Sequence, residues 1–456
     1  MGDFVPHTDA EIDAMLASLG LSSLDELFST VPEALRLAGG LDLAPGLSEP
    51  EVLERAGDVA AANRPTGREL VCFAGAGAYD HEIPAVVRRV AFRSEFVTAY
   101  TPYQPEVAQG VLQALFEYQT MVARLTGMEV ANASLYDGAS ALVEGLNLAV
   151  AATGRPDVWL SRGVHPNWRQ VAATLAVGTG HRLVDVPLHD GTTAWPEADG
   201  GSQPGAVVVQ YPNYLGCLDD VDAAAAVARR TGALLVVAVD PVAAGLLRSA
   251  GSFGADVAVG EGQPFGTPLS LGGPYLGLFA CRREHVRRLP GRLVGETVDA
   301  DGRRAYVTTL RTREQDIRRE KASSNVCTNQ TLIAVVCAVH LSWLGTGGLR
   351  ELALRCARGT RYAREALLGI EGVEPAAAAP VLREFAVRTP VPGDVVVDRM
   401  AEEGFLAGVP LGDEYGGGLL VAVTEKRTRA QIDAYAAAFE KGGRGRPPPF
   451  LARKPV

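Results

Sequence analysis

Asp240 stands where a carboxylate can do chemistry, directly after the apolar run Leu234–Val239. Such a run is typical of a buried strand, and open α/β sheets present ligands at the carboxyl ends of their strands. A carboxylate at that edge can hold a protonated pyridine nitrogen. The next predicted strand, Asp256–Val259, leads into the glycine-rich stretch Gly260–Gly266, where a pyridoxal phosphate enzyme is expected to carry its Schiff-base lysine.

That stretch has Gln263 near its centre and contains no lysine. The sequence has four lysines in all, and they are Lys321, Lys426, Lys441 and Lys454. We therefore expect that this chain cannot hold pyridoxal phosphate covalently at the usual place, and that any imine chemistry is done by something else.

Two further groups are predicted at the same edge of the sheet. His165 follows the predicted strand Val158–Ser161, where its imidazole could stack over a pyridine ring. Ser140 lies in Tyr136–Ala141, which opens a helix with small residues whose free N–H groups could receive an anion. Each feature has a structural alternative: many lone histidines are structural, Asp240 could cap the next element, and many such helices bind nothing.

A polar loop, Arg93–Glu106, precedes a predicted amphipathic helix that runs from about Pro105 to Thr126. Its hydroxyl, amide, guanidinium and carboxylate groups could hydrogen-bond a phosphate or carboxylate ligand. A well-satisfied structural turn is the alternative. Two basic clusters, Arg282–Arg288 and Arg311–Arg319, could receive an acidic partner or form ordinary solvated surface.

The composition indicates a globular chain of more than one domain, with 456 residues, 47% of them apolar and 21% charged. The net charge of −10 argues against general nucleic-acid binding. Six cysteines with no CxxC pair and no nearby histidine at zinc-ligand spacing indicate reduced thiols and no metal site. No signal-like start or membrane-spanning apolar run was identified, so we expect no membrane association and a cytoplasmic protein.

The order of predicted elements favours an α/β fold with a mostly parallel sheet, because short apolar strands alternate with helices from about Leu70 to Cys281. We expect a helical N-terminal arm over residues 1–66 and a large α/β domain over residues 67–329. A small α+β domain over residues 330–441 and a flexible Pro/Gly-rich tail over residues 442–456 complete the predicted organisation.

Several long stretches of the sequence closely resemble the glycine cleavage system P-protein family, also called glycine decarboxylase. The resemblance covers nearly the whole chain and is carried by Thr98–Glu106, Gln109–Ala114, Phe116–Met121, Ala131–Gly138, Gly260–Gly266, Gly272–Gly277 and Arg319–Gln330. Family members occur as one long chain with two similar halves or as two separate subunits, and this chain resembles the first half, subunit 1. The resemblance implies the fold of pyridoxal phosphate enzymes of fold type I.

The family resemblance implies that the cofactor lysine belongs to a partner, subunit 2, in an α2β2 heterotetramer. Glycine then reacts with the partner's pyridoxal phosphate, carbon dioxide leaves, and the aminomethyl group passes to the lipoyl arm of H-protein. We expect Tyr100, Thr101, Tyr103 and Gln104 to complete the partner's site. The chain's own pocket, around His165, Asp240, Gln263 and Ser140, is then a vestigial cofactor site.

Two alternatives remain open from the residues. The chain could be a non-catalytic structural or regulatory subunit that stabilises a partner bearing pyridoxal phosphate. It could also be a stand-alone enzyme of the same fold that uses neither the lysine nor the cofactor.

Overall fold

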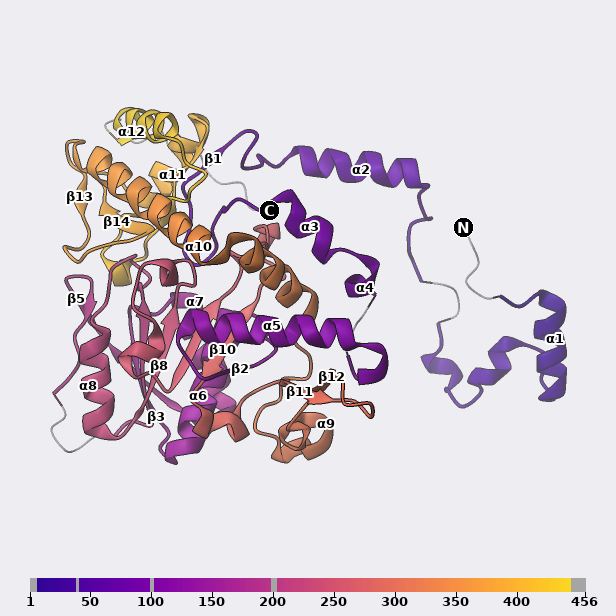
Figure 1. Ribbon diagram of the computed structural model, residues 1–456. Helices are drawn as coiled ribbons and strands as arrows, with labels where there is room; N and C mark the ends of the chain where they lie inside the picture. The colour runs from indigo at the N-terminus through magenta and orange to yellow at the C-terminus, as the bar shows by residue number, and fades with distance from the viewer. Residues whose placement is uncertain (1–5, 38–40, 99–101, 198–202, 444–456) are drawn as a thin grey trace. The chain divides into compact units, whose positions relative to one another are not determined.

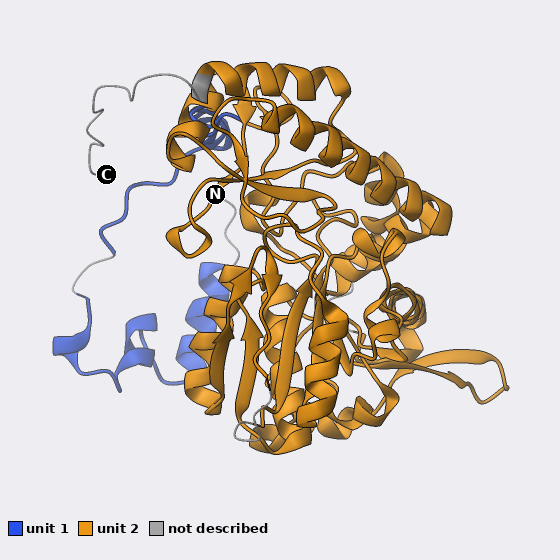
Figure 2. Ribbon diagram, turned by 90° about the vertical axis from the view of Figure 1, so that its left-hand side faces the viewer, with its two compact units in different colours: residues 1–64 blue, residues 65–456 orange. Residues whose placement is uncertain are grey.

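The protein is described by a computed structural model, which covers residues 6–37, 41–98, 102–197 and 203–443. The chain divides into two compact units, residues 1–64 and residues 65–456 (Figure 2). Tyr100, Thr101 and most of the predicted tail lie outside the described residues. The boundary predicted between residues 329 and 330 stays a prediction, as does the separate tail.

The first unit is helical. Its two α-helices are α1 (Asp9–Ser18) and α2 (Glu49–Ala61), and each begins with a capping box. The Thr8 and Glu11 side chains form the first box. Ser23 forms no such box: its side chain caps no backbone N–H, and a short 3₁₀ helix, Leu24–Phe28, follows it.

The second unit is built on a seven-stranded sheet with the order β2-β10-β9-β8-β7-β3-β4. The strands are β2 (Val130–Ala131), β3 (Asp157–Ser161), β4 (Arg182–Val186), β7 (Ala206–Tyr211), β8 (Leu234–Val239), β9 (Val257–Glu261) and β10 (Gly277–Cys281). Strands β4, β3, β7, β8 and β9 are parallel, and β10 runs antiparallel to its two neighbours. This arrangement confirms the predicted α/β class with a mostly parallel sheet.

Helices cover both faces of the sheet. Successive residues of a strand point to opposite faces, so they belong alternately to two hydrophobic clusters, one on each face. Val207 and Val209 of β7 face one cluster and Val208 faces the other. The first cluster includes residues of α5 (Gln109–Thr126), α8 (Val221–Thr231) and α10 (Thr331–Leu368), and Figure 1 shows α5 crossing in front of the sheet. The second includes residues of α6 (Gly138–Thr153) and α7 (Pro166–Thr179).

The C-terminal part adds a four-stranded antiparallel sheet with its own buried cluster. It contains β13 (Glu374–Pro375), β14 (Glu384–Arg388), β17 (Leu419–Ala422) and β16 (Val409–Pro410), with α11 (Gly393–Glu402) and α12 (Arg429–Gly443). The expectation that the alternating strands of the large sheet begin at about Leu70 was wrong. Val71–Cys72, as β1, pairs instead with β15 (Phe405–Leu406), because the chain passes the C-terminal sheet before it enters the large one.

The long helix α10 is apolar and long enough, by length and composition alone, to cross a membrane. A core helix of a globular protein passes the same test. Gly345 interrupts α10 with non-helical backbone angles. The helix packs against α3 (Ala85–Ala91), α5 and α12, as a core helix does.

Candidate functional site

The carboxyl ends of β3, β7, β8 and β9 meet at one edge of the sheet and surround a small pocket, here called the sheet-edge pocket. His165 and Asp240 line it, as their positions after β3 and β8 led us to expect. Gln263 lies behind it and contacts Tyr79, another lining residue. Ser140 is not among the lining residues, and its backbone N–H donates to the Asp137 side chain that caps α6.

Asp240 does not face an empty space. Its Oδ2 lies 2.6 Å from Nη2 of Arg383, whose side chain is 4% exposed. Its Oδ1 accepts hydrogen bonds from the backbone N–H groups of Val242 and Ala243. The carboxylate therefore caps the next turn and pairs with a buried cation of the same chain.

Tyr79 fills the space beside this ion pair. The Arg383 guanidinium lies 3.5 Å from the centre of the Tyr79 ring, a cation–π contact. The Tyr79 hydroxyl donates to Glu384 at 2.8 Å, and Gln263 holds the Tyr79 backbone through two hydrogen bonds. Glu384 also accepts from the Ala76 N–H, and burial raises its pKa to about 7.

His165 is held in one tautomer. Its Nδ1 accepts from the Asn167 N–H at 3.1 Å, so Nε2 carries the proton and donates to the Ala76 carbonyl oxygen at 2.7 Å. Burial lowers the pKa of the imidazole. Gly77 approaches the ring so closely that a Cβ there would lie 2.8 Å from the His165 Cδ2. The imidazole thus packs against the chain's own backbone.

The start of helix α6, which could have received a phosphate, is occupied by Glu261. This buried carboxylate accepts hydrogen bonds of 2.9 Å from the backbone N–H groups of Gly138, Gln263 and Leu276. Trp168 covers the same turn, since a Cβ on Gly138 would lie 2.1 Å from the indole. The hydrogen-bond acceptor at this helix start is therefore a side chain of the protein.

These contacts leave a cavity of about 50 Å³. Such a volume holds a few water molecules. A pyridine ring with its phosphate does not fit beside Tyr79, Arg383 and Glu261 as they stand, and no lysine is available to bind it. The donor set of this pocket is satisfied internally and does not match pyridoxal phosphate.

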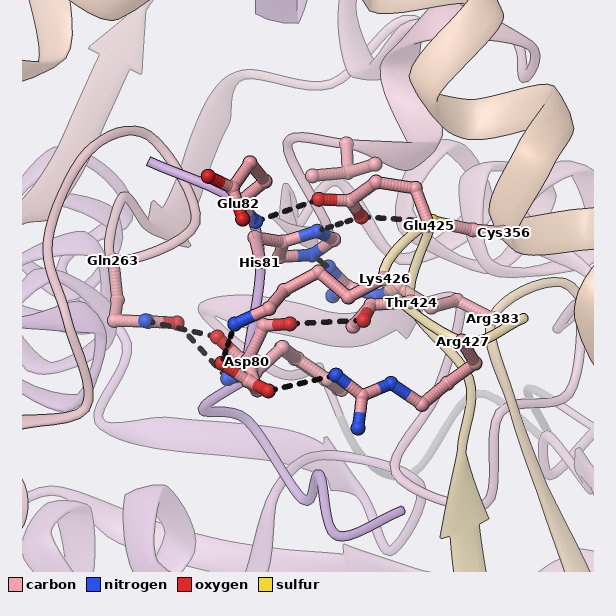
Figure 3. A network of polar contacts seen from close by, with 12 residues as sticks. Asp80, His81, Glu82, Gln263, Cys356, Arg383, Thr424, Glu425, Lys426 and Arg427 are labelled. Atoms are coloured by element: carbon pink, nitrogen blue, oxygen red, sulfur yellow. Dashed lines mark hydrogen bonds and ion pairs between the residues drawn. The ribbon is translucent and has the colours of Figure 1, made fainter. Parts of the chain in front are cut away.

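A buried polar network continues from Arg383 into the C-terminal part of the chain (Figure 3). Arg383 Nη1 lies 2.7 Å from Nε2 of His81. Because arginine only donates, Nε2 accepts, and Nδ1 carries the proton that bonds Glu425 at 2.6 Å. Burial alone would raise the pKa of Glu425, but hydrogen bonds from His81 and the Glu82 N–H lower it to about 2.

Cys356 completes a group with His81 and Glu425 whose possible ligand atoms lie within 4.8 Å of one another. Both His81 nitrogens already have partners, so we assign no metal to this group. Nearby, Asp80 binds Lys426 at 2.7 Å and Arg427 at 3.0 Å. Figure 3 shows that these contacts join the segment after β1 to the segment after β17.

A second cavity, here called the Tyr103 pocket, opens on the surface. Its volume is about 260 Å³, and it is lined by Tyr103, Arg292, Glu314, Gln315, Asp316, Val326 and Cys327. Tyr103 is 53% exposed, whereas Arg292 is 5% exposed. Gln104 lies next to the pocket, as the first residue before the short helix Pro105–Val107, and is also exposed.

Arg292 connects this pocket to the Arg319–Gln330 stretch. Its Nη2 donates to the Tyr103 hydroxyl and to the Cys327 carbonyl oxygen, both at 3.3 Å, and its Nη1 donates to Asn329 at 3.1 Å. The guanidinium lies 5.1 Å from the centre of the Tyr103 ring. Arg292 therefore fixes the orientation of Tyr103.

Sequence reasoning missed Tyr79, Arg383, Glu384 and Arg292. The first three fill the sheet-edge pocket from segments some 300 residues apart in the sequence, and no local pattern marks them. Arg292 follows Gly291 in a loop without periodicity. The one feature of the sequence that pointed to them was the absence of lysine from the Gly260–Gly266 stretch. Without a bound cofactor, the Asp240 carboxylate needs another cation as its partner.

The family model described as glycine cleavage system P-protein matches residues 2–439. A curated relative from Prosthecochloris aestuarii, named probable glycine dehydrogenase (decarboxylating) subunit 1, is 48% identical over 435 residues, covering 95% of this chain and 98% of the relative. A relative of the same name from Desulforamulus reducens is 46% identical over 440 residues, covering 95% and 98%.

Among solved structures, the chain is similar to glycine decarboxylase (P-protein) of the glycine cleavage system in inhibitor-bound form. The TM-score is 0.91 at 45% identity, covering 97% of this chain and 100% of that one. Mouse CSAD has a TM-score of 0.67 at 18% identity, covering 92% of each chain, and shows a shared fold alone.

Proposed function

The chain belongs to the glycine cleavage system P-protein family, and we propose that it works as subunit 1 of a glycine decarboxylase whose pyridoxal phosphate is held by subunit 2. The assembled enzyme is a glycine dehydrogenase that decarboxylates glycine and passes the aminomethyl group to the lipoyl arm of H-protein. The cofactor supplies the electron sink for loss of carbon dioxide. We place this assembly, an α2β2 heterotetramer, in the cytoplasm.

The sheet-edge pocket is the observation that carries this proposal. Arg383 neutralises Asp240, Glu261 occupies the start of α6, and Tyr79 fills the space between the strands and the C-terminal sheet. A chain that belongs to a pyridoxal phosphate family but has closed its own site in this way needs a second chain to bind the cofactor.

We assign Tyr103 and Gln104, with Tyr100 and Thr101 beside them in sequence, to the part of this chain that completes the partner's site. Tyr103 is exposed and yet held by Arg292, so its hydroxyl is presented in a fixed direction. Fixed donors are effective in catalysis because they need no reorganisation when charge develops on the substrate. The expected targets are the glycine carboxylate or the cofactor phosphate.

The cofactor assignment is tested by adding pyridoxal phosphate to the purified chain alone and to the chain with subunit 2. We expect the yellow colour of lysine-bound cofactor, and release of carbon dioxide from labelled glycine, only when subunit 2 is present. Colour and carbon dioxide release from this chain alone would overturn the proposal.

The loop assignment is tested with the double variant Tyr103→Phe/Gln104→Ala in the reassembled complex. We expect glycine turnover to fall by about 100-fold, the size of effect that loss of positioned hydrogen-bond donors produces. Tyr362→Phe, on α10 outside the Tyr103 pocket, is the control and should retain full turnover. Unchanged turnover in the double variant would contradict the assignment.

A purely structural or regulatory role is the second candidate, favoured by the dense internal contacts of the sheet-edge pocket. The two candidates differ in one outcome. If this chain only stabilises its partner, the double variant should assemble and turn over glycine normally, whereas a contributed site predicts normal assembly with lost turnover.

A further inference from the structure

A third cavity shares no lining residue with the two pockets described above and is strongly basic. Its volume is about 500 Å³, and five of its eight lining residues are cations, namely Arg287, Arg288, Arg313, Arg318 and Lys321. None of the lining residues is acidic. In a chain with a net charge of −10, such a gathering of one sign of charge requires a reason.

The two basic clusters seen in the sequence meet in this cavity, here called the basic pocket. Arg287 and Arg288 come from the 3₁₀ helix Arg283–Arg288, which follows β10. The other three cations come from the segment between Arg311 and Lys321. Arg313 joins the two segments, since its Nη1 donates to the carbonyl oxygens of Leu289 and Gly291.

Arg313 is itself 8% exposed, and its Nε and Nη2 have no hydrogen-bond partner among the described residues. Burial lowers the pKa of this guanidinium. A buried cation with two unused donor nitrogens is costly unless an acceptor reaches it. The side chain lines the basic pocket, so a ligand entering there is the nearest source of such an acceptor.

The remaining cations are also without carboxylate partners. Within the described ranges, no acidic side chain lies within ion-pair distance of Arg287, Arg288, Arg318 or Lys321. Neighbouring Arg311 shows the contrast, because it pairs with Asp316.

We propose that the basic pocket binds a phosphate group. Arginine guanidinium groups match the geometry of phosphate oxygens and form charge-assisted hydrogen bonds with them. The hydroxyl groups of Thr312 and Ser323 also line the cavity and add neutral donors. A phosphate, with up to two negative charges, offsets the repulsion among five cations better than a single carboxylate does.

The test is a calorimetric titration of the full chain with inorganic phosphate at constant ionic strength, with chloride as the balancing ion. The double variant Arg318→Gln/Lys321→Gln removes two exposed cations of the pocket and leaves buried Arg313 in place. The control variant Arg89→Gln/Arg350→Gln removes the same charge from exposed positions outside the pocket. Equal melting temperatures without phosphate establish that all three proteins are folded.

We expect saturable binding whose Kd rises by about tenfold in the pocket variant and stays unchanged in the control variant. A parallel titration with glycerol 3-phosphate distinguishes the source: tighter binding of the ester indicates a phosphate carried on an organic molecule, and tighter binding of the free ion indicates phosphate itself. Equal Kd values in all three proteins, or no saturable binding of either probe, would overturn the proposal. Neither result depends on subunit 2, so failure here is distinguishable from failure of the proposed glycine decarboxylase function.

Discussion

The sheet-edge pocket and the Tyr103 pocket use the same residue types in opposite ways. In the sheet-edge pocket, Arg383 is buried and Tyr79 half-buried, and both bond to groups of the same chain. In the Tyr103 pocket, Arg292 is buried but Tyr103 is exposed beside an open cavity of about 260 Å³. An arginine next to a tyrosine closes a site in one place and aims a side chain outward in the other.

The two pockets therefore have different roles: the sheet-edge pocket stabilises the fold, and the Tyr103 pocket is assigned to function. Closing the sheet-edge pocket converts the ligand-binding edge of an α/β sheet into a polar core that joins the large sheet to the C-terminal sheet. Residues there should matter mainly for the free energy of unfolding. Residues of the Tyr103 pocket should matter mainly for turnover in the assembled enzyme.

The largest expected effect is on the closed side of the comparison. Arg383→Ala leaves the largely buried Asp240 carboxylate, whose side chain is 14% exposed, without its cation and removes the donor to His81. Breaking a buried ion pair by removing one partner costs about 3–5 kcal/mol. We expect the free energy of unfolding, measured by urea titration, to fall by that amount.

Arg361→Ala is the matched control, because Arg361 pairs with Glu365 at 2.8 Å on an exposed helix surface. Exposed pairs of this kind contribute little to stability, because water and salt screen the two charges. Similar unfolding curves for the Arg383 and Arg361 variants would show that the sheet-edge pocket does not stabilise the fold.

Second in size is a pH dependence of stability that comes from Glu261. Burial raises its pKa from 4.5 to about 7, outweighing its three backbone hydrogen bonds. The folded protein therefore binds this proton more tightly than the unfolded chain does. Its contribution is fully present below about pH 4.5 and is lost as the pH rises towards 7, by on the order of 2–3 kcal/mol.

The measurement compares the free energy of unfolding of the wild-type chain and of Glu261→Gln between pH 5 and pH 7. We expect the wild type to lose stability relative to the variant over this range. Glu117→Gln, on the exposed face of α5, should follow the wild type. If the difference in free energy of unfolding between the wild type and Glu261→Gln stays constant over this pH range, Glu261 does not have a raised pKa in the folded protein.

The fold class and the residues at the carboxyl edge of the sheet could be predicted from the sequence, because both depend on local patterns. The apolar run before Asp240 and the strand before His165 place both residues at the carboxyl ends of parallel strands. The closure of the pocket could not be predicted in the same way. Glu384 meets Ala76 across 308 positions, and only the folded chain brings them together.

Short pairings were also beyond local reasoning. β1 has two paired residues, and its apolar character fits either sheet, so its partner β15 was not predictable. Neither was the hairpin of β11 (Val294–Val298) and β12 (Arg304–Thr308), whose outer residues are largely exposed. Ser140 lies where a helix start was expected, but Trp168 and Glu261 occupy the turn before it.

The smallest expected effect is in the Tyr103 pocket. It is also the most direct test of the contrast between the two pockets. Arg292→Lys keeps the charge but loses the planar fork that contacts Tyr103, Asn329 and Cys327 at once. We expect kcat/KM of the reassembled complex to fall by about tenfold, since Tyr103 loses a fixed direction. Arg282→Lys is the control, because Arg282 also makes several bonds, to Ala255, Gly254 and Asp256, but lies outside the Tyr103 pocket. If both variants lose turnover equally, the effect is a general one of arginine replacement, and Arg292 does not position Tyr103 for the reaction.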